Sequence, residues 1–230
     1  MTELREFDPF DIFDAEAARL DAFFTGLGEQ DWARPTRCAG WSVRDVLGHL
    51  AGEELYNHAA LDGTVKEFGA RLAAEGITGF NEFNQWCVTE RRAVPVEDVL
   101  AEWRAKNGET RRRMRELGWD GTQETMVGPY PNAHQAYHYD SEYATHADDI
   151  GVPVGDEEAE GRAAWRTAVG LFALGEAGSK AQVEQLADSL WVNVDHVSAE
   201  LSYPQFVEAT VGRPDPSLDP SLAAALRCLA

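Results

Sequence analysis

The chain has 230 residues, of which 44% are hydrophobic, and its seven Trp and ten Phe residues are enough for a sizeable buried core. It carries 20 basic and 40 acidic residues, and the resulting net charge of −20 repels phosphate backbones and anionic lipid headgroups, so we expect neither nucleic-acid nor membrane partners. Cys38, Cys87 and Cys228 are far apart and form no C-x-x-C pair, which excludes a disulfide framework and a Cys-rich zinc site. The acidic N-terminus has no signal-like apolar stretch, and no run of about 18 apolar residues occurs, which indicates a cytoplasmic protein.

The first half of the chain is predicted to be mostly helical. Ser42 is a candidate N-cap, because Asp45 follows three residues later and completes a capping-box pattern. Apolar residues then recur from Val43 to Leu55 at the spacing of one helix face. The predicted helices cover residues 9–26, 43–61, 79–92 and 95–118, and a connector rich in aromatic residues separates the first two.

The second half begins with a predicted loop at residues 119–132, followed by helices at 133–151 and 157–177. Residues 190–201 alternate in polarity around a possible Asp195–His196 turn and predict a short hairpin. Two short capped helices are predicted within residues 202–212 and 219–230. We therefore expect a mainly α protein, with a helical bundle at residues 8–178 and a small mixed α/β portion at residues 179–230.

The stretch SEYATHADDIG, residues 141–151, contains a candidate metal-ligand pair. Glu142 and His146 are four residues apart and share one helix face. His49 is a candidate third ligand, because it lies in the middle of a periodic helix, whereas His58 is nine residues further on and points to another face. A catalytic zinc typically takes three protein ligands of this kind and leaves one position open.

Two other interpretations of these residues remain open from the spacing alone. A glutamate and a histidine four residues apart often occur by chance on a solvated acidic face, and His49 is equally compatible with a hydrogen-bonded core histidine. His134 and His138 are also four residues apart and form an alternative ligand pair, in one row with Glu142.

The stretch DWARPTRCAGWSVRDVLGHLAGEE resembles the N-terminal signature of the mycothiol-dependent maleylpyruvate isomerase family, within the DinB-like metal-binding superfamily. The matching positions run from an Asp-Trp pair through a Pro-Thr-x-Cys-x-Gly-Trp segment to a histidine, and they are Asp31, Trp32, Pro35, Thr36, Cys38, Gly40, Trp41, Ser42, Val43, Asp45 and His49. A second signature of the family, a glutamate, a histidine and an aspartate, is matched by Glu142, His146 and Asp149. The resemblance covers about residues 10–155.

The resemblance implies a DinB-like four-helix bundle in which His49, Glu142 and His146 hold a divalent metal: zinc first, with nickel or iron as alternatives. Two neutral imidazoles and one carboxylate leave a zinc site with a charge of about +1 and an open position. A thiol bound there loses its proton. The implied activity is transfer of a small thiol, expected to be mycothiol, to a small electrophile, or isomerisation assisted by that thiol.

The predicted catalytic residues are Arg213 and Asp149. Arg213 follows a segment that resembles the family's Thr-Gly-Arg, with Val211 at the Thr position, and the resemblance implies that it binds a substrate carboxylate. Asp149 is expected either to orient His146 or to hold an arginine. We interpret Trp41 and Cys38 as structural residues, and Glu53 as a surface acid rather than an additional acid near the metal.

Three classes of function follow from these patterns: a thiol-dependent S-transferase or isomerase, a metal-binding bundle without catalysis, and a DinB-type hydrolase that uses a hydroxide in place of the thiolate. The expected partners are a small thiol and a small electrophile. The oligomeric state is left open between a monomer and a homodimer.

Overall fold

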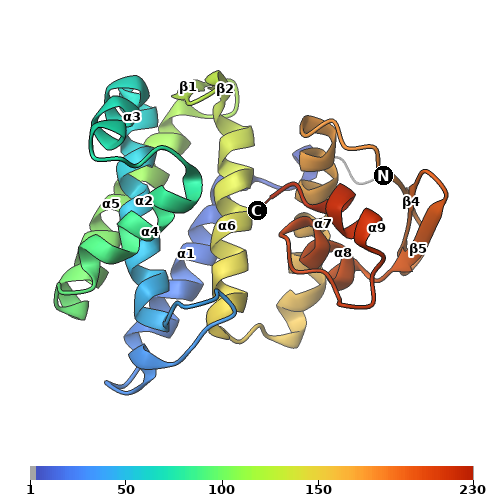
Figure 1. The fold of residues 1–230 in the computed structure, drawn as a ribbon, viewed down its shortest axis with the longest axis horizontal. Coiled ribbons are helices and arrows are strands. Elements are labelled where there is room, and N and C mark those ends of the chain that lie inside the picture. Colours follow the sequence, from blue (N-terminus) through green and yellow to red (C-terminus); the bar gives the residue numbers. More distant parts are fainter. Residues whose placement is uncertain (1–3, 230) are drawn as a thin grey trace. The chain divides into compact units, whose positions relative to one another are not determined.

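The computed structural model describes residues 4–229, which form two compact units: residues 9–152 make one, and residues 4–8 and 153–229 make the other (Figure 1). The unit of residues 9–152 is a helical bundle with one small hairpin. Its helices and strands are α1 (Pro9–Thr25), the 3-10 helix η2 (Asp31–Ala33), α2 (Val43–Asp62), α3 (Val65–Ala74), α4 (Phe80–Arg91), α5 (Val96–Leu117), β1 (Thr122–Thr125), β2 (Gly128–Pro131) and α6 (Asn132–Ile150).

Helices α1, α2, α5 and α6 make the bundle, and α3 and α4 pack against α2. The core between them is aromatic, with the Phe13 ring 5.0 Å from that of Tyr143 and the Phe24 ring 5.7 Å from that of Trp103. The predicted fold class, mainly α with a DinB-like four-helix bundle and a small mixed C-terminal portion, is confirmed.

A buried carboxylate lies at the centre of this bundle. Glu54 is fully buried, and its Oε1 accepts hydrogen bonds from Asn107 Nδ2 (2.9 Å) and from the Tyr143 hydroxyl (2.8 Å). Its Oε2 accepts from Thr110 Oγ1 at 2.5 Å, and the Tyr143 oxygen itself accepts from Trp103 Nε1 at 3.0 Å. Because every oxygen has a donor, these side chains tie α2, α5 and α6 together.

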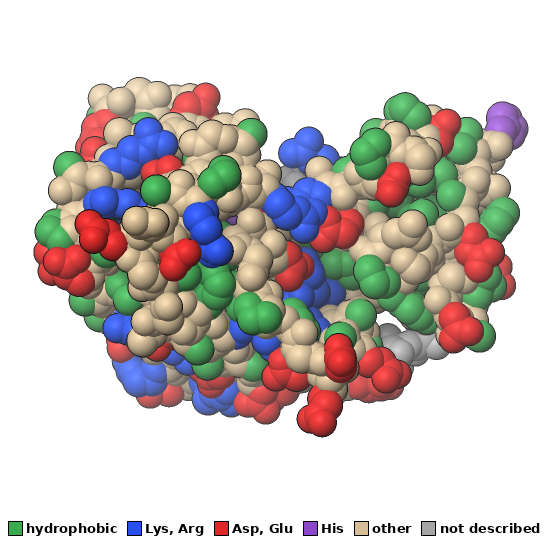
Figure 2. All heavy atoms as spheres, turned by 90° about the horizontal axis from the view of Figure 1, so that it is seen from below, with side chains coloured by type: hydrophobic (Ala, Val, Ile, Leu, Met, Phe, Trp, Pro, Cys, Tyr) green, Lys and Arg blue, Asp and Glu red, His purple; other side chains and the backbone are tan. Residues whose placement is uncertain are grey.

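The surface between α1 and α5 is crossed by ion pairs. Arg104 lies 2.6 Å from Asp21, and Arg115 lies 2.6 Å from Asp14. Figure 2 shows basic and acidic side chains next to one another on one face of the molecule. Exposed pairs of this kind contribute about 0–1 kcal/mol each, so the buried core dominates the stability of the bundle.

The second unit contains the 3-10 helix η1 (Leu4–Glu6), α7 (Asp156–Glu176), β3 (Gln182–Gln185), β4 (Leu190–Val194), β5 (Val197–Leu201), α8 (Tyr203–Thr210) and α9 (Pro220–Leu226). The three strands form an antiparallel sheet in the order β3-β4-β5. The predicted hairpin is present, and Asp195 at its turn has a positive φ of 53°. The apolar face of the sheet packs with α8, α9 and Leu174 of α7 in one hydrophobic cluster.

The structure differs from the predicted domain boundary. The predicted bundle includes residues 157–177 and the predicted second portion begins at residue 179, whereas the compact units divide between residues 152 and 153, so that α7 belongs with the C-terminal elements. The physical reason is close packing within that unit: a Cβ added at Gly170 would lie 3.1 Å from atoms of both Phe206 and Thr210 on α8. Residue 230, the last of the predicted second portion, lies outside the described residues.

The hairpin β1–β2, helix α3 and strand β3 were not predicted. The segment expected to be a loop at residues 119–132 contains the hairpin β1–β2, whose inward side chains include the polar Gln123 and Thr125, so no hydrophobic alternation marks it. Helix α3 and the short polar edge strand β3 were also missed. Among residues 4–229, no helix is both long and apolar enough to cross a membrane.

Candidate metal centre

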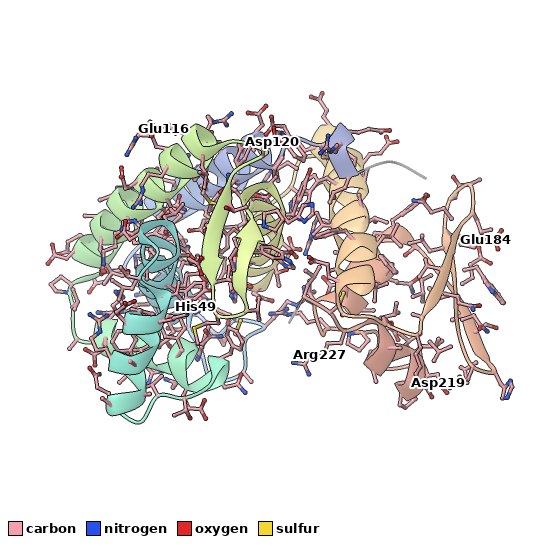
Figure 3. The ribbon with its side chains drawn as sticks, turned by 90° about the horizontal axis from the view of Figure 1, so that it is seen from above. His49, Glu116, Asp120, Glu184, Asp219 and Arg227 are labelled. Carbon is pink, nitrogen blue, oxygen red and sulfur yellow. The ribbon has the colours of Figure 1, made fainter. Side chains whose placement is uncertain are left out.

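Helices α2 and α6 bring the three predicted ligands together. The capping box starts α2 at the predicted place: Asp45 N donates to Ser42 Oγ (3.3 Å), and Ser42 N donates to Asp45 Oδ2 (2.9 Å). His49 is one turn further along α2 and lies within the bundle, whereas Glu116 and Asp120 are at its surface (Figure 3).

The ligand atoms of the three residues face one another. Glu142 Oε1 lies 3.0 Å from His49 Nε2 and 3.0 Å from His146 Nε2. The three donor atoms lie within 4.8 Å of one another. The His49 side chain is only 2% exposed, whereas that of Glu142 is 33% exposed, so the cluster is open to solvent on the side of the carboxylate. That this cluster holds a metal remains a prediction.

The charges in the cluster stabilise one another in the absence of a metal. Burial alone would raise the pKa of Glu142, but the charge of His146 and hydrogen bonds from both histidines hold it well below the usual value. Burial alone would lower the pKa of His146, but the charge of Glu142 and hydrogen bonds with Asp149, Cys38 and Glu142 raise it well above the usual value. The pKa of His49 is lowered, mainly by burial. The arrangement therefore favours an anionic Glu142 between one neutral and one cationic imidazole.

Asp149 contacts His146, which is one of the two roles expected for it. Its Oδ2 lies 3.1 Å from His146 Nδ1, on the side of the imidazole opposite Glu142, and its side chain is 0% exposed. Arg37 Nε lies 3.9 Å from Asp149 Oδ1, so an arginine is near enough for the second expected role. The catalytic part of Asp149 stays a prediction. Cys38, interpreted as a structural residue, also reaches this carboxylate, with Sγ 3.1 Å from Oδ2.

Trp41 and Glu53 are closer to the cluster than the sequence indicated. The Trp41 ring lies 5.2 Å from the His49 ring and 6.4 Å from the His146 ring, so this tryptophan covers both imidazoles as well as packing at the start of α2. Glu53 Oε2 lies 3.5 Å from His49 Nε2, with 15% of its side chain exposed. Burial, the charge of Glu142 and the charge of Glu54 raise the pKa of Glu53 well above its usual value. The only signal for Glu53 in the sequence was its position one turn after His49.

The remaining histidines lie elsewhere. His138 Nε2 is 3.2 Å from the Tyr130 hydroxyl, and the Tyr130 ring also lies 6.1 Å from the ring of His134. Neither belongs to a group of candidate ligands among the described residues, which disfavours the alternative ligand pair. His58 points away from His49, as predicted, and donates from Nε2 to the Lys106 carbonyl at 3.0 Å.

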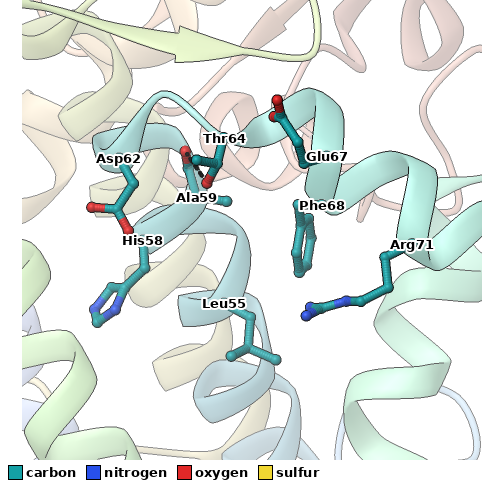
Figure 4. A pocket seen from close by; sticks show the side chains of 8 residues that line it. All are labelled: Leu55, His58, Ala59, Asp62, Thr64, Glu67, Phe68 and Arg71. Atoms are coloured by element: carbon teal, nitrogen blue, oxygen red, sulfur yellow. Dashed lines mark hydrogen bonds between the residues drawn. The ribbon is translucent and has the colours of Figure 1, made fainter.

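A pocket of about 440 Å³ lies on the opposite face of α2. Leu55 and Phe68 face its interior, and the Arg71 guanidinium lies 5.1 Å from the centre of the Phe68 ring (Figure 4). His58 also lines the pocket. None of the candidate metal ligands lines this pocket, so we treat it as separate from the cluster.

Arg213 lies in the C-terminal unit, just after α8. Its backbone N–H donates to the Glu208 carbonyl at 2.8 Å, and its Nη1 donates to the Val211 carbonyl at 3.1 Å. These contacts fix the end of α8. The predicted role of Arg213 in binding substrate therefore remains a prediction.

The fold and the cluster define a helical-bundle protein with a candidate centre of two histidines and one glutamate. Residues 13–151 match the family model described as the mycothiol maleylpyruvate isomerase N-terminal domain, and the chain belongs to this family. The family resemblance seen in the sequence is therefore confirmed.

Two groups of individual proteins are similar to the chain. Crystal structures of the mycothiol-dependent maleylpyruvate isomerase and of one of its mutants each have a TM-score of 0.64 at 12% identity. The match covers 94% of both chains for the former, and 93% of this chain and 92% of the other for the mutant. This likeness supports the shared fold.

Uncharacterized proteins of two Mycobacterium tuberculosis strains are 30% identical to the chain over an alignment of 114 residues, which covers 46% of this chain. The match spans only 43% of those curated relatives.

Proposed function

We propose that the protein is a metal-dependent enzyme that activates a low-molecular-weight thiol, mycothiol or one of its class, for addition to a small electrophile. The outcome is either isomerisation of the electrophile, after which the thiol leaves, or transfer of the thiol. The observation that carries this proposal is the convergence of His49, Glu142 and His146 between α2 and α6, in the part of the chain that matches the family model.

The donor set fits a divalent metal such as zinc. Zinc binds imidazole nitrogen and carboxylate oxygen at about 2.0–2.2 Å, so neighbouring ligand atoms around a tetrahedral ion lie about 3.4 Å apart. The two distances from Glu142 Oε1 to the histidine nitrogens are both 3.0 Å, so these ligand atoms would have to move apart by a few tenths of an ångström to hold the ion. Two imidazoles and one carboxylate suit zinc, nickel and iron, and they leave a coordination position open.

When bound, the metal would lower the pKa of a coordinated thiol and so supply a thiolate at neutral pH. The chain's own side chains supply the surroundings. His49 and His146 present Nε2, and Asp149 accepts from Nδ1 of His146 and thereby fixes the tautomer that leaves Nε2 free. Trp41 covers the two imidazoles and restricts the access of water to them. Glu53 Oε2, near His49 Nε2 but outside the ligand set, is the proposed acceptor of the thiol proton.

The thiol is proposed to come from outside the chain, because the ligand set contains only nitrogen and oxygen donors. Cys87 is not an alternative nucleophile: burial and the nearby charge of Glu53 raise the pKa of its thiol to about 12. The family description and the names of the structurally similar enzymes support mycothiol as the cosubstrate. We propose Arg213 as a group that binds a substrate carboxylate; Arg213→Gln should then raise KM for a carboxylate substrate with little change in metal content.

The metal centre is tested by elemental analysis of the purified protein. The parent should carry one divalent ion per chain, and His49→Ala, Glu142→Ala and His146→Ala should each carry none above background. His58→Ala is the matched control, because it removes an imidazole from the opposite face of α2. Equal metal content in the parent and the three ligand variants would refute the metal centre.

The activity is tested by incubating the metal-loaded protein with mycothiol and an electrophile. A haloarene or a bimane reports transfer by formation of a thioether, and maleylpyruvate reports isomerisation. Acceleration that disappears in His49→Ala supports the proposal. A metal-loaded protein that accelerates neither reaction would instead be a metal-binding protein, and hydrolysis of amides or esters without thiol would identify a hydrolase.

A further inference from the structure

We propose that Cys38 is a positioning residue for His146, acting through Asp149. Its thiol donates to the same carboxylate oxygen that accepts the hydrogen bond from His146 Nδ1, and so it holds the carboxylate in the place that directs His146 Nε2 toward Glu142. This inference rests on the proposed metal centre and extends it to a residue that the sequence analysis had treated as structural.

The three side chains are in direct contact. Cys38 Sγ lies 3.1 Å from Asp149 Oδ2, and His146 Nδ1 lies 3.1 Å from the same oxygen. The distance between Cys38 Sγ and His146 Nδ1 is longer, at 3.7 Å. Both the Cys38 thiol and His146 Nδ1 therefore donate to the same oxygen of the Asp149 carboxylate. Because Asp149 is buried, the geometry of its carboxylate depends on these protein contacts more than on solvent.

The loop that carries Cys38 is itself fixed at both ends. Cys38 N donates to Thr36 Oγ1 at 3.1 Å, and Trp41 N donates to the Cys38 carbonyl at 3.0 Å. Arg37 N donates to the Asp149 backbone carbonyl at 3.1 Å, which ties the loop to the last turn of α6. The thiol is therefore held at one place relative to Asp149, as a positioning group must be.

Cys38 could alternatively be a metal ligand, because Cys38, His146 and Asp149 also lie close enough together to hold a cation. Tetrahedral zinc keeps sulfur at about 2.3 Å and oxygen at about 2.0–2.2 Å, which places the two ligand atoms about 3.5 Å apart. The observed 3.1 Å suits an S–H donor to a carboxylate, and a cation here would need the same opening of a few tenths of an ångström as one held by Glu142. The orientation of His146 decides between the two. His146 would also need to turn Nδ1 from its hydrogen bond to the metal, whereas Nε2 already faces Glu142.

The experiment measures zinc affinity by competition with a chromophoric chelator in four proteins: the parent, Cys38→Ala, Cys38→Ser and Cys228→Ala. Partners of this kind typically change metal affinity 10–100-fold. We expect Cys38→Ala to weaken zinc binding about 10-fold. The serine hydroxyl of Cys38→Ser replaces the donor and should restore most of the affinity. Cys228→Ala, which removes a thiol in the other unit, should bind zinc as the parent does. Parent-like affinity in Cys38→Ala, or a Cys38→Ser variant as weak as the alanine variant, would overturn the inference.

Two further measurements separate positioning from a general structural effect and from direct ligation. In an Asp149→Asn background, Cys38→Ala should have a smaller effect than in the parent, because both act on one interaction; fully additive effects would overturn the inference. The cobalt-substituted parent should show no intense sulfur-to-metal charge-transfer band, and a band that is lost in Cys38→Ser would identify Cys38 as a ligand instead. If His49→Ala also binds zinc as the parent does, the metal centre itself fails; if only the Cys38 variants are unaffected, the failure is confined to this inference.

Discussion

Gly52 is the point of closest approach between α2 and α4, and it provides a sharp test of the packing that holds His49 in place. A Cβ at position 52 would overlap Cys87 Cβ and lie 2.6 Å from Cys87 Sγ. It would also lie 2.9 Å from Arg91 Nη1, which is held by a hydrogen bond to the Cys87 carbonyl. Gly48, one turn earlier on the same helix, is a matched control, because its added Cβ would lie 3.4 Å from the nearest atom.

The size of the effect follows from these distances. The tightest contact is with Cys87 Cβ at 2.3 Å, so α4 must move away from α2 by about 1.3 Å to bring this atom to an ordinary contact of about 3.6 Å. Overpacking costs about 1–3 kcal/mol, and here about 2–3 kcal/mol, because the closest atom is a Cβ, which cannot rotate away. Replacing a helical glycine by alanine returns about 1 kcal/mol. We therefore expect Gly52→Ala to lower the free energy of unfolding of the bundle by about 1–2 kcal/mol, or about 2–8 °C in Tm. Gly48→Ala should be neutral or stabilise the bundle by up to about 1 kcal/mol.

The assay is calorimetry together with urea unfolding followed by circular dichroism, on the parent and both variants. Because the two compact units can unfold separately, the variants are compared on the transition that includes the bundle. Zinc affinity is measured in parallel, since a shift of α2 would move His49 relative to Glu142. If Gly52→Ala and Gly48→Ala have the same Tm, contact with α4 does not constrain position 52, and the reasoning is refuted.

Three further outcomes are expected in the bundle. Ser42→Ala should destabilise it by about 1 kcal/mol through loss of the cap, measured by urea unfolding, and Ser42→Asp should recover most of this loss. Burial opposes a low pKa for Asp45, but hydrogen bonds from Arg92 and Ser42 lower it. Its carboxylate therefore stabilises the fold at neutral pH, and the stability difference between the parent and Asp45→Asn should shrink below about pH 4; a difference that grows on acidification would contradict this. Tyr143→Phe removes a donor to Glu54 and should cost about 1–3 kcal/mol in chemical unfolding, whereas a neutral result would show that the buried carboxylate finds another partner.

The sequence determined the local structure where chemical groups act on their own helix. Ser42 and Asp45 cap each other within three residues, so the start of α2 was predicted to the residue. Glu142 and His146 share a face of α6 because the helix repeats every 3.6 residues, whatever surrounds it. The link from these two to His49, across 93 residues, was supplied by the family signature, because spacing alone does not show which helices meet.

The tertiary structure decided which partners the predicted faces meet. Cys38 lies 108 residues from His146 in the chain, and nothing near it in sequence indicated contact with Asp149. Glu53 appeared to be a surface acid, because its inward direction depends on where α6 crosses α2. Helix α7 has the same limit: its apolar stripe is visible in sequence, but the elements that bury the stripe, in the C-terminal unit, are not. Periodicity determines that a face is buried, whereas packing between distant segments determines what it is buried against.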